Sequence, residues 1–233
     1  MARRWLSYAI CALIVQSLAA CSEEPPVGNN AAPVVTEQEN EASAMDRKLV
    51  VAFGDSLYAG YGVAQDESFP HELERILRAQ GHAVEVRNAG VSGETTQGGL
   101  ERLAFTLDGL PRKPDLVLLG LGGNDMLRGL DPEQSEKNLR AMLDILKARE
   151  LPVMLTGMLA APNMGKDYGR RFNAIYSELA ADYGVPLYPF FLEGVIGNRK
   201  FMQSDSLHPN ALGIDIVAEK IAPLVSRSLT AAR

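Results

Sequence analysis

Apolar and polar positions predict an alternation of strands and helices from Arg47 onward. Short apolar runs rich in β-branched residues indicate buried strands, and longer stretches with apolar residues three or four positions apart indicate amphipathic helices. Strands are expected at residues 48–53, 84–88, 115–121, 152–158 and 185–190, and helices at 69–80, 97–110, 133–149, 169–183 and 211–229. This alternation predicts an α/β fold, a three-layer α/β/α sandwich around a central, mostly parallel five-stranded sheet.

Single residues mark the expected ends of several helices. Gly81 and Gly184 stand where a helix C-cap is expected, and Pro111 follows the end of another helix. Asp131 and Pro132 open a helix as its N-cap and first helical residue. Functional sites in open parallel sheets gather beyond the carboxyl ends of the strands, so the loops at that edge are the place to look for chemistry.

The first 46 residues differ from the rest of the chain. Arg3 and Arg4 precede a mostly apolar run over residues 5–20, which is short for a membrane span and typical of a secretory signal. The run ends in Leu-Ala-Ala followed by Cys21, which resembles the lipobox of bacterial lipoproteins, in which the cysteine is lipid-modified and becomes the first mature residue. The alternatives are an uncleaved anchor helix and an ordinary cleavage site beside an incidental cysteine.

Three segments are therefore expected along the chain. Residues 1–20 form a signal peptide, residues 21–46 a lipidated Cys21 with a disordered acidic tether, and residues 47–233 the folded domain. Cleavage would remove Cys11, so the mature protein could form no internal disulfide. We expect an exported, monomeric protein of the bacterial cell envelope, anchored to a membrane through Cys21 with its domain in the periplasm.

The distribution of charge along the sequence limits the kinds of molecule that the protein is expected to bind. The formal net charge is −6, but six of the acidic residues precede Arg47 and the folded part is nearly neutral. No basic patch of the kind that follows phosphates is present in the sequence, which argues against nucleic acid as a partner.

Gly54, Asp55 and Ser56 follow the first predicted strand directly, an arrangement that delivers a serine to the sheet edge. An ordinary turn is the alternative for this tripeptide taken alone. A serine nucleophile needs a base, and His208 is the candidate, with Asp205 three residues before it to orient the ring. The other two histidines, His71 and His82, are interpreted as solvated.

Four segments now fall at one edge of the predicted sheet. They are 54–57 (Gly-Asp-Ser-Leu), 88–93 (Asn-Ala-Gly-Val-Ser-Gly), 122–125 (Gly-Gly-Asn-Asp) and 205–209 (Asp-Ser-Leu-His-Pro). In this order they resemble the SGNH (GDSL) hydrolase family, and from about residue 47 the chain is similar to its thioesterase I, lysophospholipase L1 and arylesterase-like branch. Further matching stretches are 54–61, 98–103, 123–129 and 168–173.

The resemblance implies a flavodoxin-like sheet and a set of oxyanion donors. These are the backbone N–H of Ser56, the backbone N–H of Gly93 and the side-chain amide of Asn124. Gly90 is a rival of Gly93 for this role, and Asn124 would otherwise be a turn residue. Asp55 and Asp125 are interpreted as local hydrogen-bonding groups without a role as acids in the reaction.

A serine hydrolase that cleaves carboxylic esters or thioesters through an acyl-enzyme is the expected function. The alternatives are a carbohydrate O-deacetylase or acyltransferase and, more remotely, a noncatalytic envelope-binding lipoprotein. The sequence contains no Gly-x-Ser-x-Gly elbow, P-loop or dinucleotide motif and no metal-ligand spacing, so no cofactor or metal is expected. Small and apolar residues at 156–168 suit an acyl or aryl wall, with a plain surface loop as the alternative.

Overall fold

The computed structural model describes residues 46–231. Its centre is a sheet of five parallel strands in the order β2-β1-β3-β4-β5. The strands are β1 (Lys48–Gly54), β2 (Val84–Gly90), β3 (Leu116–Gly120), β4 (Val153–Thr156) and β5 (Leu187–Tyr188). All the predicted strands are present, and the fold class is confirmed, but β5 is much shorter than the 185–190 expected from its sequence.

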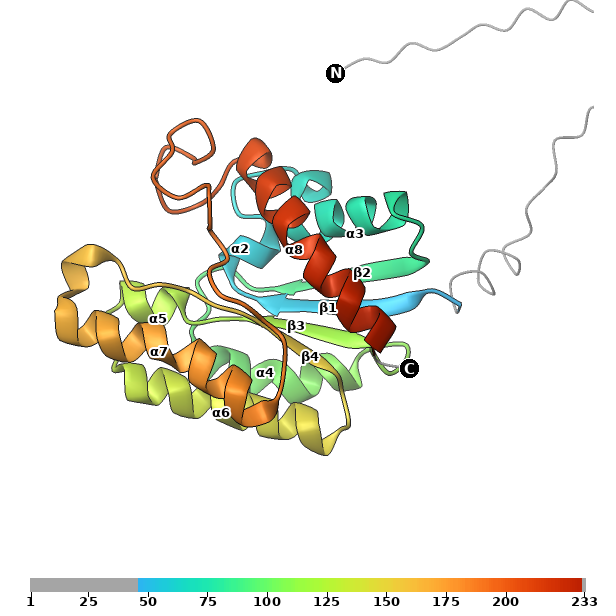
Figure 1. The fold of residues 1–233 in the computed structure, drawn as a ribbon, viewed down its shortest axis with the longest axis horizontal. Helices are drawn as coiled ribbons and strands as arrows, with labels where there is room; N and C mark the ends of the chain where they lie inside the picture. Colours follow the sequence, from blue (N-terminus) through green and yellow to red (C-terminus); the bar gives the residue numbers. More distant parts are fainter. Residues whose placement is uncertain (1–45, 232–233) are drawn as a thin grey trace, which may run out of the picture.

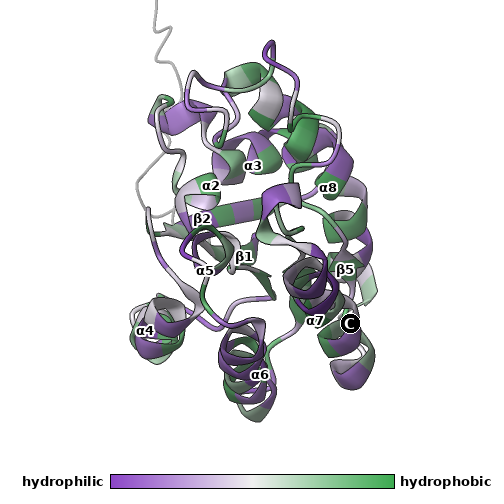
Figure 2. Ribbon diagram, turned by 90° about the vertical axis from the view of Figure 1, so that its left-hand side faces the viewer, coloured by the Kyte–Doolittle hydropathy of each residue, from purple (hydrophilic) through white to green (hydrophobic). Residues whose placement is uncertain are grey.

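Helices cover both faces of the sheet and complete the three layers (Figures 1 and 2). Helices α3 and α8 pack together on one face, and α4, α6 and α7 line the other. Their bounds are α3 (Phe69–Ala79), α4 (Thr96–Asp108), α6 (Pro132–Ala148), α7 (Lys166–Tyr183) and α8 (Ala211–Ala231). Asp131 is the N-cap of α6, as expected, and its side chain accepts a hydrogen bond from the backbone N–H of Glu133.

Four short helical turns were not predicted. They are α2 (Ser56–Ala59), α5 (Gly123–Leu127) and the 3₁₀ turns η1 (Gln65–Glu67) and η2 (Pro162–Met164). Such short helices are marginal without tertiary contacts, which explains why periodicity did not reveal them. Helix α7 also begins three residues before the predicted start at 169, because Gly165 at φ 87° lets the chain turn into it.

Strand β1 is buried from its second residue onward. Leu49 to Phe53 are fully shielded from solvent, as expected for a strand covered by helices on both faces. In the parallel register, Gly54 pairs with Gly90 on one side and Gly120 on the other. The three strands β1, β2 and β3 therefore end at the same level, and the segments that follow them meet at one edge.

Tyr58 holds α2 against this edge. Its hydroxyl hydrogen-bonds with the hydroxyl of Thr156 at 2.7 Å, and its ring packs edge-on against Phe69 and stacks with Phe191. Because the ring is fully buried, the short helix that carries Ser56 is anchored in the core. Within residues 46–231, no helix is long and apolar enough to cross a membrane.

Candidate active site

Ser56 is the first residue of α2 and lies directly beyond the carboxyl end of β1. Asp55 is the N-cap of this helix, and its Oδ1 accepts a hydrogen bond from the backbone N–H of Leu57 at 3.0 Å. The N–H of a first helical residue has no partner within its helix. The local structure therefore presents both the hydroxyl and the backbone N–H of Ser56 at the sheet edge.

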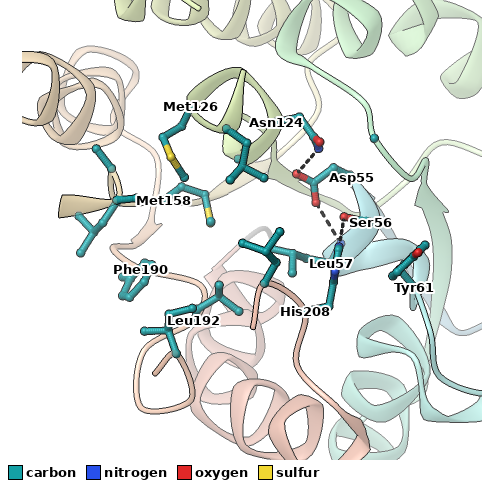
Figure 3. A pocket seen from close by; sticks show the side chains of 18 of the residues that line it. Asp55, Ser56, Leu57, Tyr61, Asn124, Met126, Met158, Phe190, Leu192 and His208 are labelled. Atoms are coloured by element: carbon teal, nitrogen blue, oxygen red, sulfur yellow. Dashed lines mark hydrogen bonds between the residues drawn. The ribbon is translucent and has the colours of Figure 1, made fainter. Parts of the chain in front are cut away.

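His208 and Asp205 lie in the loop before α8 and approach Ser56, as the sequence predicts; Figure 3 shows His208 beside Ser56. His208 Nε2 lies 2.8 Å from Ser56 Oγ, and His208 Nδ1 lies 2.6 Å from Asp205 Oδ2. The other oxygen of Asp205 accepts from the backbone N–H groups of Leu207 and His208 at 2.9 and 3.0 Å. Three side chains from two distant segments thus form one continuous hydrogen-bonded chain.

The direction of these hydrogen bonds follows from the chemistry of the carboxylate. Burial alone would raise the pKa of Asp205, but hydrogen bonds from the His208 ring and from the backbone of His208 and Leu207 lower it to about 2. An ionised carboxylate only accepts, so Nδ1 of His208 carries the proton and Nε2 is left to accept from the Ser56 hydroxyl. This is the tautomer that a histidine base requires.

The loop of Asp205 and His208 is closed by backbone and side-chain contacts. Gln203 N donates to His208 O at 2.8 Å, and its Nε2 donates to Tyr61 O and Pro209 O at 2.7 and 2.9 Å. The ring of Tyr61 packs on the His208 ring with 4.6 Å between centroids. Sequence reasoning did not single out Gln203, and it named Tyr61 only as the last residue of the matching stretch 54–61.

Gly93 and Asn124 lie on the same cavity as Ser56, and Gly90 does not. Gly93 adopts φ 79°, a left-handed conformation that favours glycine. Gly90 instead donates its N–H to Asn88 Oδ1 at 2.9 Å and allows the backbone of Ala59 to approach closely. The geometry therefore favours Gly93 over its rival.

Asp55 forms a second contact that was not predicted. Its Oδ2 accepts from Asn124 Nδ2 at 3.3 Å, so the residue before the serine also orients the asparagine amide (Figure 3). Asp55 is 4% exposed, and burial raises its pKa to about 6, against the opposing hydrogen bond from Leu57 and the nearby charge of His208. The expected local backbone role is present together with this longer-range one.

Asp125 fixes the helix that carries Asn124. Its carboxylate is buried and accepts from Thr96 N at 2.8 Å, Thr96 Oγ1 at 2.6 Å and Ser135 Oγ at 3.2 Å. Asn138 Nδ2 extends the network to Thr96 Oγ1 at 3.0 Å. This buried network joins α4, α5 and α6, so Asp125 is structural, as interpreted from the sequence.

An apolar cavity of about 680 Å³ opens beside Ser56. Aliphatic, aromatic and thioether side chains from several segments make up most of its wall: Leu57, Tyr61, Met126, Leu127, Met158, Leu159, Phe190, Leu192, Ile196 and Leu207 (Figure 3). The segment 158–162 borders it directly, as the sequence of the 156–168 loop suggested. The cavity can therefore shelter an apolar group next to the serine hydroxyl.

The two remaining histidines lie away from this cavity. His71 is exposed, as interpreted, but the solvated interpretation of His82 is only partly right. His82 is half-buried, and its Nε2 hydrogen-bonds with Ser226 Oγ at 2.8 Å, which ties the end of α3 to α8. Among residues 46–231, no group of three or more His, Cys, Asp or Glu side chains is arranged to hold a metal ion.

The parallel α/β sheet and the chain from Ser56 through His208 to Asp205, set beside an apolar cavity, define a serine hydrolase. The family model of the GDSL-like lipase/acylhydrolase family matches residues 52–216. The chain belongs to this family and is an ester-bond hydrolase.

Relatives and solved structures agree with this assignment. The chain is 41% identical to an arylesterase of Vibrio mimicus, over 78% of this chain and 89% of that protein. It is 39% identical to thioesterase 1/protease 1/lysophospholipase L1 of Escherichia coli K12, over 79% and 88%. The structure resembles AlinE4, an esterase of the SGNH-hydrolase family, with 44% identity and a TM-score of 0.68 over 79% and 97%. It also resembles TesA, with 36% identity and a TM-score of 0.73 over 78% and 99%.

Proposed function

We propose that the protein hydrolyses acyl or aryl esters and thioesters with Ser56 as nucleophile, His208 as base and Asp205 as the residue that orients His208. The observation that carries this proposal is the unbroken hydrogen-bonded chain of these three side chains, whose serine end opens into the apolar cavity. The cavity supports a substrate with an apolar acyl or aryl group.

The reaction takes place in two halves. The Ser56 hydroxyl attacks the ester carbonyl while His208 Nε2 takes its proton, and the imidazolium then gives that proton to the departing alcohol or thiol as the carbonyl–oxygen or carbonyl–sulfur bond breaks. Water next attacks the acyl-enzyme, its proton passes to His208, and the carboxylic acid leaves as the proton returns to Ser56. Asp205 stabilises the imidazolium in both halves.

Each attack places negative charge on the former carbonyl oxygen. The donors for this oxyanion are the backbone N–H groups of Ser56 and Gly93 and the Asn124 amide, which border the cavity together. Removal of one such donor typically slows an enzyme by about 100- to 1,000-fold. The contact with Asp55 Oδ2 occupies one proton of the Asn124 amide and leaves the other available.

The apolar wall favours an acyl or aryl substrate over an acetylated sugar. Sugar hydroxyls need several polar partners, and the wall near Ser56 is mainly aliphatic and aromatic. The names of the relatives, arylesterase and thioesterase 1/lysophospholipase L1, also support this substrate class. A noncatalytic role is disfavoured because each of the three catalytic side chains is in hydrogen-bonding position.

The purified protein should hydrolyse nitrophenyl esters and acyl thioesters, and Ser56→Ala should abolish turnover and labelling by a fluorophosphonate. Ser92→Ala is a matched control, because Ser92 also borders the cavity but contacts no histidine among the described residues. Turnover by Ser56→Ala at the rate of the parent would refute the assignment. An acetylated glycan in the same panel tests the deacetylase alternative.

We also propose that residues 1–20 are a cleaved signal and that lipid on Cys21 anchors a monomeric domain in the periplasm, through a tether at 21–46. This expectation rests on the sequence, since residues 1–45 lie outside the described part of the chain. Cys21→Ser should move the protein from the membrane fraction to the soluble fraction, whereas Cys11→Ser should leave it at the membrane. Retention of Cys21→Ser at the membrane would support an uncleaved anchor, and light scattering tests the monomer.

A further inference from the structure

Arg128 links the two sides of the site in a way that the catalytic chain does not require. It is the C-cap of α5 and donates its own N–H to Asn124 O at 3.1 Å, so Arg128 is fixed to the short helix that carries Asn124. The guanidinium Nη2 of Arg128 donates to the carbonyl oxygen of Gly93 at 2.6 Å. One helix therefore contacts the loop of one proposed oxyanion donor and carries the other.

The Gly93 loop has few other restraints near its glycine. Val91 N donates to Gly54 O at 3.0 Å, and Glu94 N donates to Val91 O at 3.2 Å. Residues 91–93 are exposed. Among the described residues, the only atom outside the adjacent chain within 4 Å of an ideal Cβ on Gly93 is Arg128 Nη2, at 3.8 Å. Because glycine has the greatest backbone freedom, its orientation depends on such contacts.

A second arginine fixes the far side of the same loop. Arg102 Nε donates to both oxygens of Glu94 at 2.6 and 2.8 Å, and its Nη2 donates to Ala89 O and Gly54 O at 2.9 and 3.2 Å. Its guanidinium also lies 3.8 Å from the centre of the Phe53 ring. Glu94 is thereby tied to the ends of β1 and β2, and its N–H is bonded to Val91 O. The carbonyl of Gly93 is the group of this peptide that the Arg128 contact restrains.

We propose that Arg128 is a positioning residue for hydrolysis. By holding the Gly93 carbonyl it fixes the backbone of Gly93, so that the Gly93 N–H and the Asn124 amide remain directed at the same oxyanion. This inference rests on the proposed function, in which Gly93 and Asn124 are oxyanion donors. A hydrogen bond from a charged guanidinium is strong enough to hold a glycine loop that has no side chain to pack.

Arg128→Met removes both the charge and the donor. We expect kcat on a small soluble ester to fall about tenfold, less than the loss of a whole oxyanion donor, with KM changed by less than about twofold. Inactivation by a fluorophosphonate, which forms a tetrahedral adduct at Ser56, should slow in parallel. Arg128→Lys keeps a charged donor of similar reach and should restore most of kcat, whereas Arg128→Gln, which is shorter, should not.

Arg170→Met is the matched control. Arg170 is also an exposed arginine that contacts a nearby residue, Asp167 at 2.6 Å, but its hydrogen bond is made to its own helix α7 and not to the Gly93 loop. This variant should keep the parental kcat. Thermal unfolding of each variant shows whether a loss of kcat reflects unfolding, and the comparison of Lys with Gln at position 128 serves if the methionine variant does not fold.

A double-mutant cycle with Gly93→Ala tests whether Arg128 affects kcat through the backbone of Gly93. A Cβ at φ 79° strains the backbone and displaces the donor, so Arg128→Met should cost much less in that background than in the parent. Fully additive losses, or parental kcat in Arg128→Met, would overturn the positioning role. The proposed function stands or falls separately, because it requires only that the parent hydrolyses esters and that Ser56→Ala does not.

Discussion

Asp55 should make the stability of the protein fall as the pH rises through the weakly acidic range. The carboxyl group is 4% exposed, and burial raises its pKa from 3.8 to about 6. A raised pKa means that the folded state binds the proton more tightly than the unfolded state. The neutral carboxyl therefore stabilises the fold fully below about pH 4, and this stabilisation is lost as the pH rises through about 6.

The size of the effect follows from the shift in pKa. A change from 3.8 to about 6 is roughly two units, and each unit corresponds to about 1.4 kcal/mol, so the loss is about 3 kcal/mol. That is a large part of the free energy of unfolding of a typical domain, about 5–15 kcal/mol. The sign is opposite for Asp205, whose pKa is lowered to about 2 and whose contribution is lost only as the pH falls toward that value.

Asp55→Asn removes the titration while keeping the size of the side chain. Urea unfolding of the parent and of the variant at pH 4 to 8 should give a difference in unfolding free energy that shifts by about 3 kcal/mol in favour of the variant as the pH rises. Any loss of the contact with Asn124 adds a constant offset, and other carboxylates cancel in the difference. Parallel stability curves over this range would refute the reasoning. The variant should also lose activity, because its single amide oxygen cannot accept from both the Leu57 N–H and the Asn124 amide.

Two further predictions concern buried polar contacts. Tyr58→Phe removes the partner of the Thr156 hydroxyl and should lower the free energy of unfolding by about 1–2 kcal/mol in urea denaturation; an unchanged midpoint would show that the contact at 2.7 Å carries no net stability. Asp125→Ala leaves the donors of Thr96 and Ser135 without an acceptor and should cost about 3 kcal/mol or more. Asp125→Asn keeps an acceptor and should cost clearly less, so equal costs for the two variants would contradict the network.

The sheet and its covering helices were predictable because each is long or strongly patterned. A strand-like run such as 48–53 and a cap such as Asp131 predict the local structure from neighbouring residues alone. The short helices α2 and α5 were not predictable, since their four and five residues fold only against the strand ends and the buried Asp125 network. The brief pairing of β5 likewise depends on how far β4 extends beside it.

The candidate site was predictable to the extent that the topology brings segments together. The loops after β1, β2 and β3 meet because parallel strands share a carboxyl edge, and the spacing of Asp205 and His208 places both in one turn. The supporting contacts were not predictable. Gln203 and Tyr61 are 142 residues apart in the sequence, and Arg128 and Gly93 are 35 residues apart. The residues around each partner therefore do not indicate that the two form a hydrogen bond.

Close packing against glycine determines where the nucleophile lies. An ideal Cβ on Gly120 would stand 2.5 Å from the Tyr58 and Thr156 hydroxyl oxygens, and one on Gly54 would stand 2.5 Å from the Tyr58 ring. Both distances are too short for any side chain, so these strand ends must be glycine for Tyr58 to enter the core and for α2 to cross the sheet edge. The position of Ser56 thus depends on Gly54 and Gly120, which have no side chains and so leave room for Tyr58 of α2. Polar contacts, from Asp55 on one side and the arginine-held loop on the other, then aim the groups around it.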